Sequence, residues 1–221
     1  MGININIFHE IKKELDATKT TLVAVSKIQS EESILKLYDA GQRDFGENYV
    51  QELLTKYEHL PKDINWHYIG HLQSNKVKYI VPFVSLIQGV DSEKLLTEIN
   101  KQSLKNDRIT DCLLQVHIAE EETKFGFDKN ELEHFFSNEN NLKNVRIRGL
   151  MGMASFTDDK TKVKSEFLQL KNSFDEYFNG NISVEPKPIL SMGMSGDYKM
   201  AIEEGSNMVR IGSLLFGARI S

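Results

Sequence analysis

The stretch TTLVAVSKIQSEESILKLYDAG, residues 20–41, joins a β-rich apolar run to an amphipathic helical pattern. The apolar run ends at Lys27, and Ser30 followed by two acidic residues is typical of the start of a helix. Apolar residues then recur at helical spacing until Gly41, which ends the pattern. This stretch therefore predicts one buried β-strand followed by one α-helix.

The same strand–helix unit recurs along the chain. We predict eight strands, at 20–26, 43–45, 66–69, 84–90, 111–118, 145–151, 189–190 and 208–211. The helices expected between them cover about 30–41, 49–57, 76–80, 92–103, 130–136, 163–177 and 197–204. A further helix, from Ile7 to Leu15, precedes the first strand.

Eight strand–helix units in a chain of 221 residues favour an α/β fold with a closed (β/α)8 barrel of the TIM type. The strands are continuous apolar runs, which is the pattern expected when both faces of a parallel sheet are buried. Neither a linker nor a low-complexity tract interrupts the pattern. We therefore expect residues 1–221 to form a single domain, with one extra helix at its N-terminus.

Composition excludes several classes of function. The formal net charge is −5 and the lysines are scattered among acidic residues, so the sequence gives no sign of a basic surface that would bind nucleic acid. No apolar run reaches the roughly 18 residues of a membrane span, and no signal peptide is visible. Cys112 is the only cysteine, and no histidine has metal-ligand spacing. We expect a cytoplasmic protein in a reducing environment that binds no nucleic acid, membrane or metal ion.

Two short stretches rich in glycine and serine stand near the end of the chain. Residues 191–196 read SMGMSG, and residues 209–213 read VRIGS. In the expected barrel they follow strands seven and eight, where many barrels bind a phosphate through backbone N–H groups at a helix start. Serine hydroxyls can donate to such a phosphate, and glycine lets the backbone approach it. The alternative is two tight turns that need glycine for their shape alone.

Lys27 ends the first strand, at the same rim of the expected barrel as these two stretches. Partial burial and a neighbouring cation such as Arg210 would both favour its neutral, nucleophilic amine. A lysine beside a phosphate site predicts a Schiff base with a phosphorylated aldehyde, first pyridoxal phosphate and second a sugar phosphate. The alternative is a lysine that covers the strand end and keeps its ammonium in water.

Six motifs together resemble the pyridoxal phosphate homeostasis protein family. The match covers the whole chain in order, and the family has the barrel fold of the alanine racemase N-terminal domain, which agrees with the eight units counted above. The motifs are AVSK at 24–27, FGEN at 45–48, WHYIGHLQSNK at 66–76, RGLM at 148–151, LSMGMS at 190–195 and VRIG at 209–212.

The resemblance implies roles for particular residues. Lys27 would form an aldimine with pyridoxal 5′-phosphate, and Arg210 would face the pyridine nitrogen. The remaining cofactor contacts would come from the ends of other strands, with Ser191, Ser195, Gly212 and Ser213 at the phosphate cradle and Asn48 and Met151 along the ring. His71 is a candidate for the rim of the pocket without an assigned role, or else a satisfied polar residue at a helix start.

Arg210 limits the chemistry that such a site would promote. A guanidinium cannot accept a proton from the pyridine ring, so it favours the neutral ring, which is a weaker electron sink. Alanine racemases also take a second base from an additional β domain, and we expect no such domain in this protein. We expect a monomer without robust catalysis that buffers pyridoxal phosphate or delivers it to apo-enzymes, as part of vitamin B6 homeostasis.

Two enzymatic interpretations stay open. The first is a pyridoxal-phosphate-dependent amino-acid racemase or lyase of modest activity. The second is a Schiff-base aldolase in which Lys27 attacks a sugar phosphate directly. Replacing Arg210 by Glu is expected to leave cofactor binding intact and to change the cofactor's spectrum, because the phosphate and lysine contacts would remain.

Overall fold

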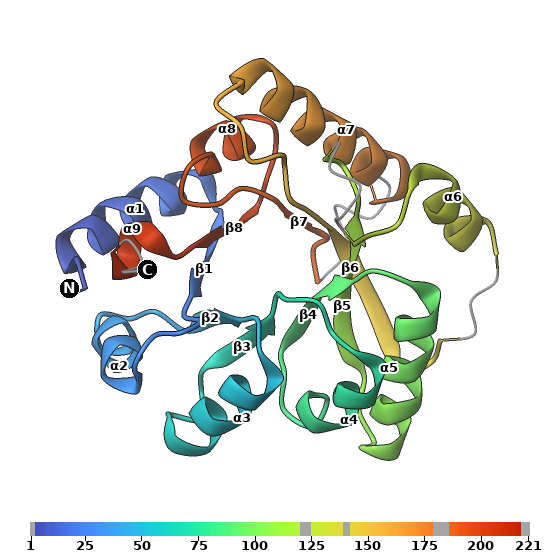
Figure 1. Cartoon of the computed structure of the whole chain (residues 1–221), viewed down its shortest axis with the longest axis horizontal. Helices are drawn as coiled ribbons and strands as arrows, with labels where there is room; N and C mark the ends of the chain where they lie inside the picture. Colours follow the sequence, from blue (N-terminus) through green and yellow to red (C-terminus); the bar gives the residue numbers. More distant parts are fainter. Residues whose placement is uncertain (1–2, 120–124, 139–141, 179–185, 218–221) are drawn as a thin grey trace.

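The computed structural model describes residues 3–119, 125–138, 142–178 and 186–217. Eight parallel strands form a closed barrel in chain order, with β8 paired to β1 (Figure 1). This confirms the (β/α)8 barrel expected from the sequence. The strands are β1 (Thr21–Val25), β2 (Asp44–Glu47), β3 (Asn65–Tyr68), β4 (Leu86–Val90), β5 (Thr110–Val116), β6 (Val145–Gly152), β7 (Ile189–Ser191) and β8 (Met208–Ile211).

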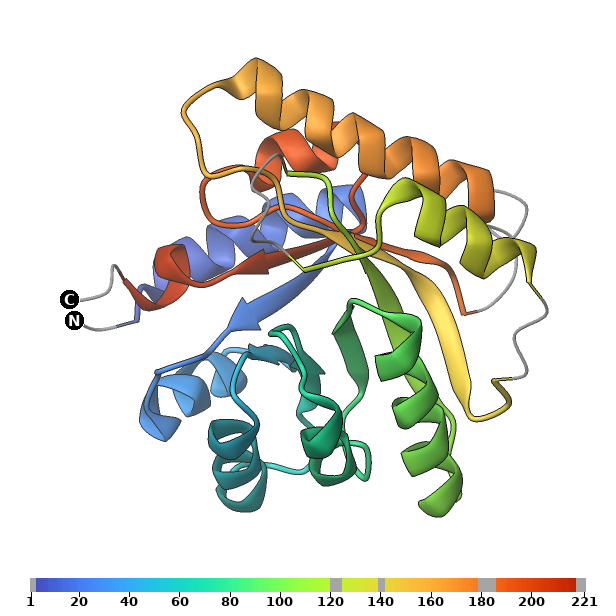
Figure 2. The ribbon, with the colours of Figure 1, turned by 45° about the vertical axis from the view of Figure 1, so that its right-hand side comes forward.

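Helices surround the ring of strands on its outer side (Figures 1 and 2). The predicted extra N-terminal helix is present and lies beside the last helix, where the Asn4 N–H donates to the Leu215 carbonyl oxygen at 3.3 Å. The helices are α1 (Ile5–Thr18), α2 (Glu31–Asp39), α3 (Val50–His59), the 3-10 turn η1 (Ser74–Lys76), α4 (Val77–Ile80), α5 (Glu93–Lys105), α6 (Lys129–Ser137), α7 (Lys160–Phe178), α8 (Tyr198–Glu203) and α9 (Ser213–Phe216).

Local capping explains where several helices begin. The hydroxyl of Ser30 accepts from the Ser33 N–H at 3.2 Å, as the sequence pattern at 30–32 predicts. Ser92 caps α5 in the same way. Asp128 and Glu131 form a reciprocal capping box at the start of α6. These contacts satisfy backbone donors that the first turn of a helix cannot pair internally.

The predicted boundaries differ from the observed ones by a few residues in places. The largest consequence is at β2, which continues to Glu47 instead of ending at 45. Glu47 belongs to the strand because it pairs with Tyr68 of β3, and its carboxylate is buried against Lys56. The short helix α9, at 213–216, was not among the expected helices.

The apolar core has two parts. The larger part packs the outward faces of the strands against the helices, and Cys112 lies fully buried within it. Burial raises the pKa of the Cys112 thiol, which therefore stays protonated. The smaller part groups Val23, Leu86, Leu113, Met151 and Met208.

Parallel pairing puts the C-terminal ends of all eight strands at one rim of the barrel. Residues that follow β1, β2, β7 and β8 therefore gather at that rim, although they are far apart in the sequence. Ala24 pairs with Phe45 of β2 on one side and with Ile211 of β8 on the other, so Lys27 lies between the ends of these two strands.

Candidate functional site

Lys27 lies two residues beyond the end of β1 and is half-buried. The next residue, Ile28, has a φ of 63°, a left-handed conformation that costs a bulky side chain about 1–3 kcal/mol. The Ile28 N–H donates to Glu52 Oε1 of α3 at 2.6 Å. The chain just after Lys27 is thus held in an unfavourable conformation by a carboxylate from another element.

The ammonium of Lys56 is buried next to this turn. It donates to the carbonyl oxygen of Ser26 at 2.7 Å, to Glu47 Oε1 at 2.7 Å and to Glu52 Oε1 at 2.6 Å. The backbone on both sides of Lys27 is therefore tied to one ionic cluster. Our sequence reasoning missed this cluster. Its only signal is the i,i+4 spacing of Glu52 and Lys56, and such pairs usually lie on exposed helix faces.

Burial raises the pKa of Glu47, and attraction to Lys56 opposes the shift only in part. The folded protein therefore holds a proton on Glu47 more firmly than the unfolded chain does. The contribution of Glu47 to stability must then fall as the pH rises above the ordinary value of 4.5.

We expect the Glu47→Gln variant to lack this pH dependence, because an amide does not titrate. The unfolding free energy of the wild type minus that of Glu47→Gln should decrease from pH 4.5 toward neutrality. Urea unfolding at a series of pH values measures the difference. A difference that stays constant or grows with pH would contradict the shift.

The structure brings the two glycine- and serine-rich stretches together. The Gly212 N–H donates to Ser195 Oγ at 3.2 Å, and the Arg210 N–H donates to the Gly193 carbonyl oxygen at 3.0 Å. Gly193 has a φ of 95°, and a Cβ there would lie 2.6 Å from the Cβ of Ala201, so this turn requires glycine. The loops after β7 and β8 thus form one unit, while their role at a phosphate stays a prediction.

The guanidinium of Arg210 is buried, with 4% of the residue exposed. Its Nη1 donates to the carbonyl oxygen of Ser191 at 3.0 Å and to Ser191 Oγ at 2.5 Å, and its Nη2 donates to the carbonyl oxygen of Gly152 at 2.9 Å. Burial lowers the pKa of Arg210 to about 10, although the charge of Asp197 acts in the opposite direction. Arg210 therefore joins the ends of β6, β7 and β8 through neutral oxygen atoms.

The other predicted residues lie in different surroundings. Asn48 follows β2, and its backbone carbonyl accepts from the Tyr68 hydroxyl at 2.9 Å. Burial raises the pKa of Tyr68 to about 12, so the hydroxyl remains a donor. Asn48 Oδ1 is buried without a hydrogen-bond partner in the described part of the chain. Met151 is fully buried, and Ser213 is exposed at the start of α9.

His71 lies on the loop after β3. Its Nδ1 is 2.8 Å from Asp91 Oδ2, and its ring stacks on Phe125 with centroids 4.0 Å apart. His71 and Asn48 line the same pocket, of about 430 Å³. These contacts agree with the interpretation of His71 as a satisfied polar residue, while its place at the rim of a cofactor pocket stays a prediction.

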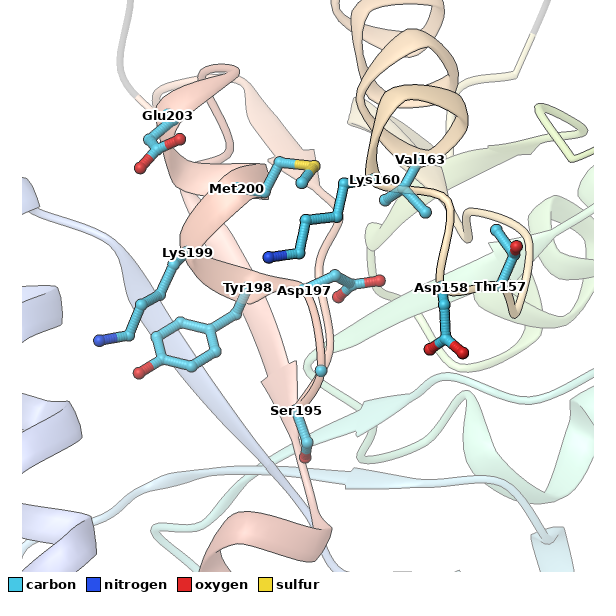
Figure 3. A pocket seen from close by; sticks show the side chains of 11 residues that line it. Thr157, Asp158, Lys160, Val163, Ser195, Asp197, Tyr198, Lys199, Met200 and Glu203 are labelled. Carbon is cyan, nitrogen blue, oxygen red and sulfur yellow. The ribbon is translucent and has the colours of Figure 1, made fainter.

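A larger cavity, of about 480 Å³, lies between the loop before α7 and the start of α8 (Figure 3). Lys160 extends from the start of α7 toward α8, and Thr157 and Asp158 lie on the loop before it. Of the predicted cofactor residues, all of which the structure describes, Ser195 alone lines this cavity. The cavity therefore borders the serine-rich loop but does not contain Lys27.

The described residues hold neither a metal-binding cluster nor a membrane-spanning helix. Within 3–119, 125–138, 142–178 and 186–217, no group of three or more His, Cys, Asp or Glu side chains could hold a metal ion. None of the helices in those ranges is long and apolar enough to cross a membrane.

Comparison with known proteins places this arrangement in a family. The model of the alanine racemase N-terminal domain matches residues 6–220. A pyridoxal phosphate homeostasis protein of Aquifex aeolicus is 42% identical over 200 residues, covering 90% of this chain and 86% of the relative. One from Schizosaccharomyces pombe is 35% identical over 212 residues, covering 95% and 89%. The chain belongs to the pyridoxal phosphate homeostasis protein family.

Solved structures agree with this family assignment. PipY of Synechococcus elongatus, solved with pyridoxal phosphate bound, is 32% identical and has a TM-score of 0.86, covering 96% of this chain and 99% of PipY. An alanine racemase of Bartonella henselae, at 16% identity and a TM-score of 0.70, shares the fold, and this chain covers 62% of its length. The resemblance found in the six sequence motifs is thereby confirmed at the level of the family and the fold.

Proposed function

We propose that this protein binds pyridoxal 5′-phosphate at the rim of its barrel and takes part in intracellular pyridoxal phosphate homeostasis by buffering or delivering it. The observation that carries the proposal is the joined pair of loops after β7 and β8. The hydrogen bond from the Gly212 N–H to Ser195 Oγ joins these loops, and parallel pairing puts them at the same rim as Lys27. The pyridoxal phosphate bound to PipY supports the same ligand.

The residues present fit this cofactor. Asn48 Oδ1 is a buried acceptor without a partner in the described chain, so it is available to a donor on a ligand. Ser195 and Ser213 carry hydroxyls, and Gly212 leaves its backbone uncovered by a side chain. We propose that Ser195, Gly212 and Ser213 hold the phosphate, and that Asn48 and Met151 contact the ring. Ser191 would act on the cofactor through Arg210, because its hydroxyl is already bound to Arg210 and Gln88.

We propose that the neutral amine of Lys27 would condense with the aldehyde of the cofactor, the aldehyde oxygen leaving as water. The ionic cluster around Lys56 fixes the backbone before and after Lys27, so the side chain starts from a defined position. When bound, the cofactor supplies an aldehyde that exchanges between amines and a ring that can withdraw electrons. Exchange with an incoming amine would release it to another protein.

Arg210 supports binding over catalysis in this proposal. Its Nη atoms donate to neutral oxygens of Ser191 and Gly152, and a guanidinium has no acceptor to offer a pyridinium N–H. The ring nitrogen beside it would stay unprotonated, and carbanion chemistry would be weakly promoted. We propose that residues 1–221 act as one cofactor-binding domain; the monomeric state, the cytoplasmic location and the apo-enzyme partners stay predictions.

We expect borohydride treatment of the loaded wild type to fix one pyridoxyl group on Lys27. Intact mass and peptide mapping measure this adduct. Lys27→Ala should show no adduct and no visible absorbance from a lysine-linked aldehyde, because the amine proposed to form the bond is gone. Lys36→Ala, which removes an exposed lysine of α2, is the control and should label like the wild type. Equal labelling of Lys27→Ala and wild type would refute the proposed site.

Delivery and turnover need separate measurements. Mixing the loaded protein with an apo-enzyme that requires pyridoxal phosphate should activate the apo-enzyme. The time course of activation, compared with that for free cofactor, shows whether transfer occurs.

Incubation of the protein with single enantiomers of several amino acids, followed by chiral analysis, tests the racemase interpretation. Turnover that is abolished in Lys27→Ala would favour the enzyme over the carrier.

A further inference from the structure

Five polar side chains form a continuous hydrogen-bonded chain through the barrel. Arg210 Nη1 lies 2.5 Å from Ser191 Oγ, which lies 2.7 Å from Gln88 Oε1. Gln88 Nε2 lies 3.0 Å from His67 Nδ1, and His67 Nε2 lies 3.0 Å from Asp44 Oδ1. Arg210 stands near the C-terminal end of β8, and Asp44 is the first residue of β2. The chain therefore leads from the proposed cofactor rim toward the opposite end of the barrel.

The orientation of the Gln88 amide, with Oε1 toward Ser191 and Nε2 toward His67, gives the hydrogen-bonded chain its direction. A guanidinium only donates, so the Ser191 oxygen accepts from Arg210 and its hydrogen donates to the carbonyl oxygen of Gln88. The amide nitrogen of Gln88 then donates to His67 Nδ1. His67 must be neutral, with its proton on Nε2, where it donates to the carboxylate of Asp44.

Most members of this hydrogen-bonded chain of side chains are buried. Ser191 and Gln88 have no exposed surface, and Arg210 and His67 are 4% exposed. A buried polar network is stable when every member has its partner, and it is costly when one is missing. Each donor hydrogen points away from the guanidinium of Arg210 and toward the carboxylate of Asp44. The aligned dipoles therefore stabilise the negative charge on Asp44.

We propose that Gln88 and His67 are positioning residues that hold Ser191 as an acceptor toward Arg210 and thereby fix the orientation of the guanidinium. Gln88 is the central link, because it is the one group that both accepts from Ser191 and donates to His67. The orientation of Arg210 toward a pyridine nitrogen rests on the proposed function. The hydrogen-bonded chain of side chains and the protonation of His67 do not depend on the proposed function.

The test compares Gln88→Glu and Gln88→Leu with the wild type in the cofactor-free protein. Nitrogen NMR of the imidazole reports which nitrogen carries the proton. We expect a neutral His67 protonated on Nε2 in the wild type. In Gln88→Glu, the carboxylate only accepts, so His67 should gain a second proton, on Nδ1. In Gln88→Leu, His67 should remain neutral and lose the hydrogen bond at Nδ1.

The second measurement titrates each variant with pyridoxal phosphate. We expect Gln88→Leu to weaken binding by about tenfold and to shift the absorption band, since one buried polar group is left unpaired beside Arg210. Gln115→Leu is the matched control, because Gln115 is another buried glutamine, whose amide donates to the Phe125 carbonyl oxygen instead. It should leave the His67 signals unchanged.

Several results would overturn the proposal. Protonation of His67 on Nδ1 in the wild type excludes the stated direction, as does a His67 that does not respond to Gln88→Glu. Normal binding and an unshifted band in Gln88→Leu would show that the chain does not position Arg210. If the wild type binds no pyridoxal phosphate, the proposed function fails, and the imidazole signals still decide whether the chain exists.

Discussion

Lys56→Met is expected to lower the free energy of unfolding by about 3–5 kcal/mol, the usual cost of leaving one member of a buried ion pair without its partner. Lys56 and Glu47 have 5% and 0% of their side chains exposed, and their charged atoms are 2.7 Å apart. Methionine has a similar stem but cannot neutralise Glu47. Urea unfolding measures the loss. If the unfolding free energy of the variant and of the wild type falls with urea at the same slope, the two transitions are comparable.

Lys36→Met is the matched control for this prediction. Lys36 and Glu32 also form an i,i+4 pair at 2.6 Å, on α2, but their side chains are 55% and 78% exposed. Solvent screens such a pair, so its removal should change stability little. The double variant Lys56→Met/Glu47→Gln should recover part of the loss, because no buried charge is then left alone. Equal effects of Lys56→Met and Lys36→Met would contradict the burial argument.

The same variant bears on the proposed site. Lys56 holds the carbonyl oxygen of Ser26 and the carboxylate of Glu52, and Glu52 holds the N–H of Ile28. Without the ammonium, Glu52 is held less firmly, and the left-handed conformation of Ile28 is less well stabilised. We therefore expect the folded Lys56→Met protein to form the borohydride-fixed adduct on Lys27 more slowly than wild type.

The sequence was sufficient to predict the barrel because its signals are local. Apolar runs mark the strands, and caps such as Ser30 and Ser92 mark helix starts, so β8 was placed at 208–211 as observed. The meeting of the loops after β7 and β8 also follows, because neighbouring parallel strands end at the same rim. The short α9 carries no comparable signal, since four residues show no helical period.

The buried polar contacts could not be predicted in the same way. Ser191 and Gln88 are separated by 103 residues and belong to non-neighbouring strands, and their contact depends on which side chains a closed barrel turns inward. Nothing in the sequence distinguishes Lys56 from solvated helix lysines. Predictions from strand ends therefore named Lys27, Arg210 and Ser191, but not the buried Lys56 and Gln88 to which they are linked.

Arg210→Glu is expected to destabilise the protein strongly, by about 3–5 kcal/mol or more, because it puts a carboxylate where a buried cation stands. Arg210 donates to the carbonyl oxygens of Ser191 and Gly152, and a carboxylate in the same place would face these oxygens without a donor. The sequence alone suggested that cofactor binding would survive this change. The observed contacts give Arg210 a structural role in addition to any electronic one.

Arg210→Gln separates the two roles. Its amide keeps donors for the carbonyl oxygens and removes the charge, so it should lose less stability than Arg210→Glu. Urea unfolding of both variants, followed by titration with pyridoxal phosphate, gives stability and spectrum side by side. If Arg210→Glu unfolds at the wild-type urea concentration and binds the cofactor with an altered spectrum, Arg210 tunes the ring without supporting the barrel. If both variants are destabilised and only Arg210→Gln binds pyridoxal phosphate, the guanidinium stabilises β6, β7 and β8 even without a ligand.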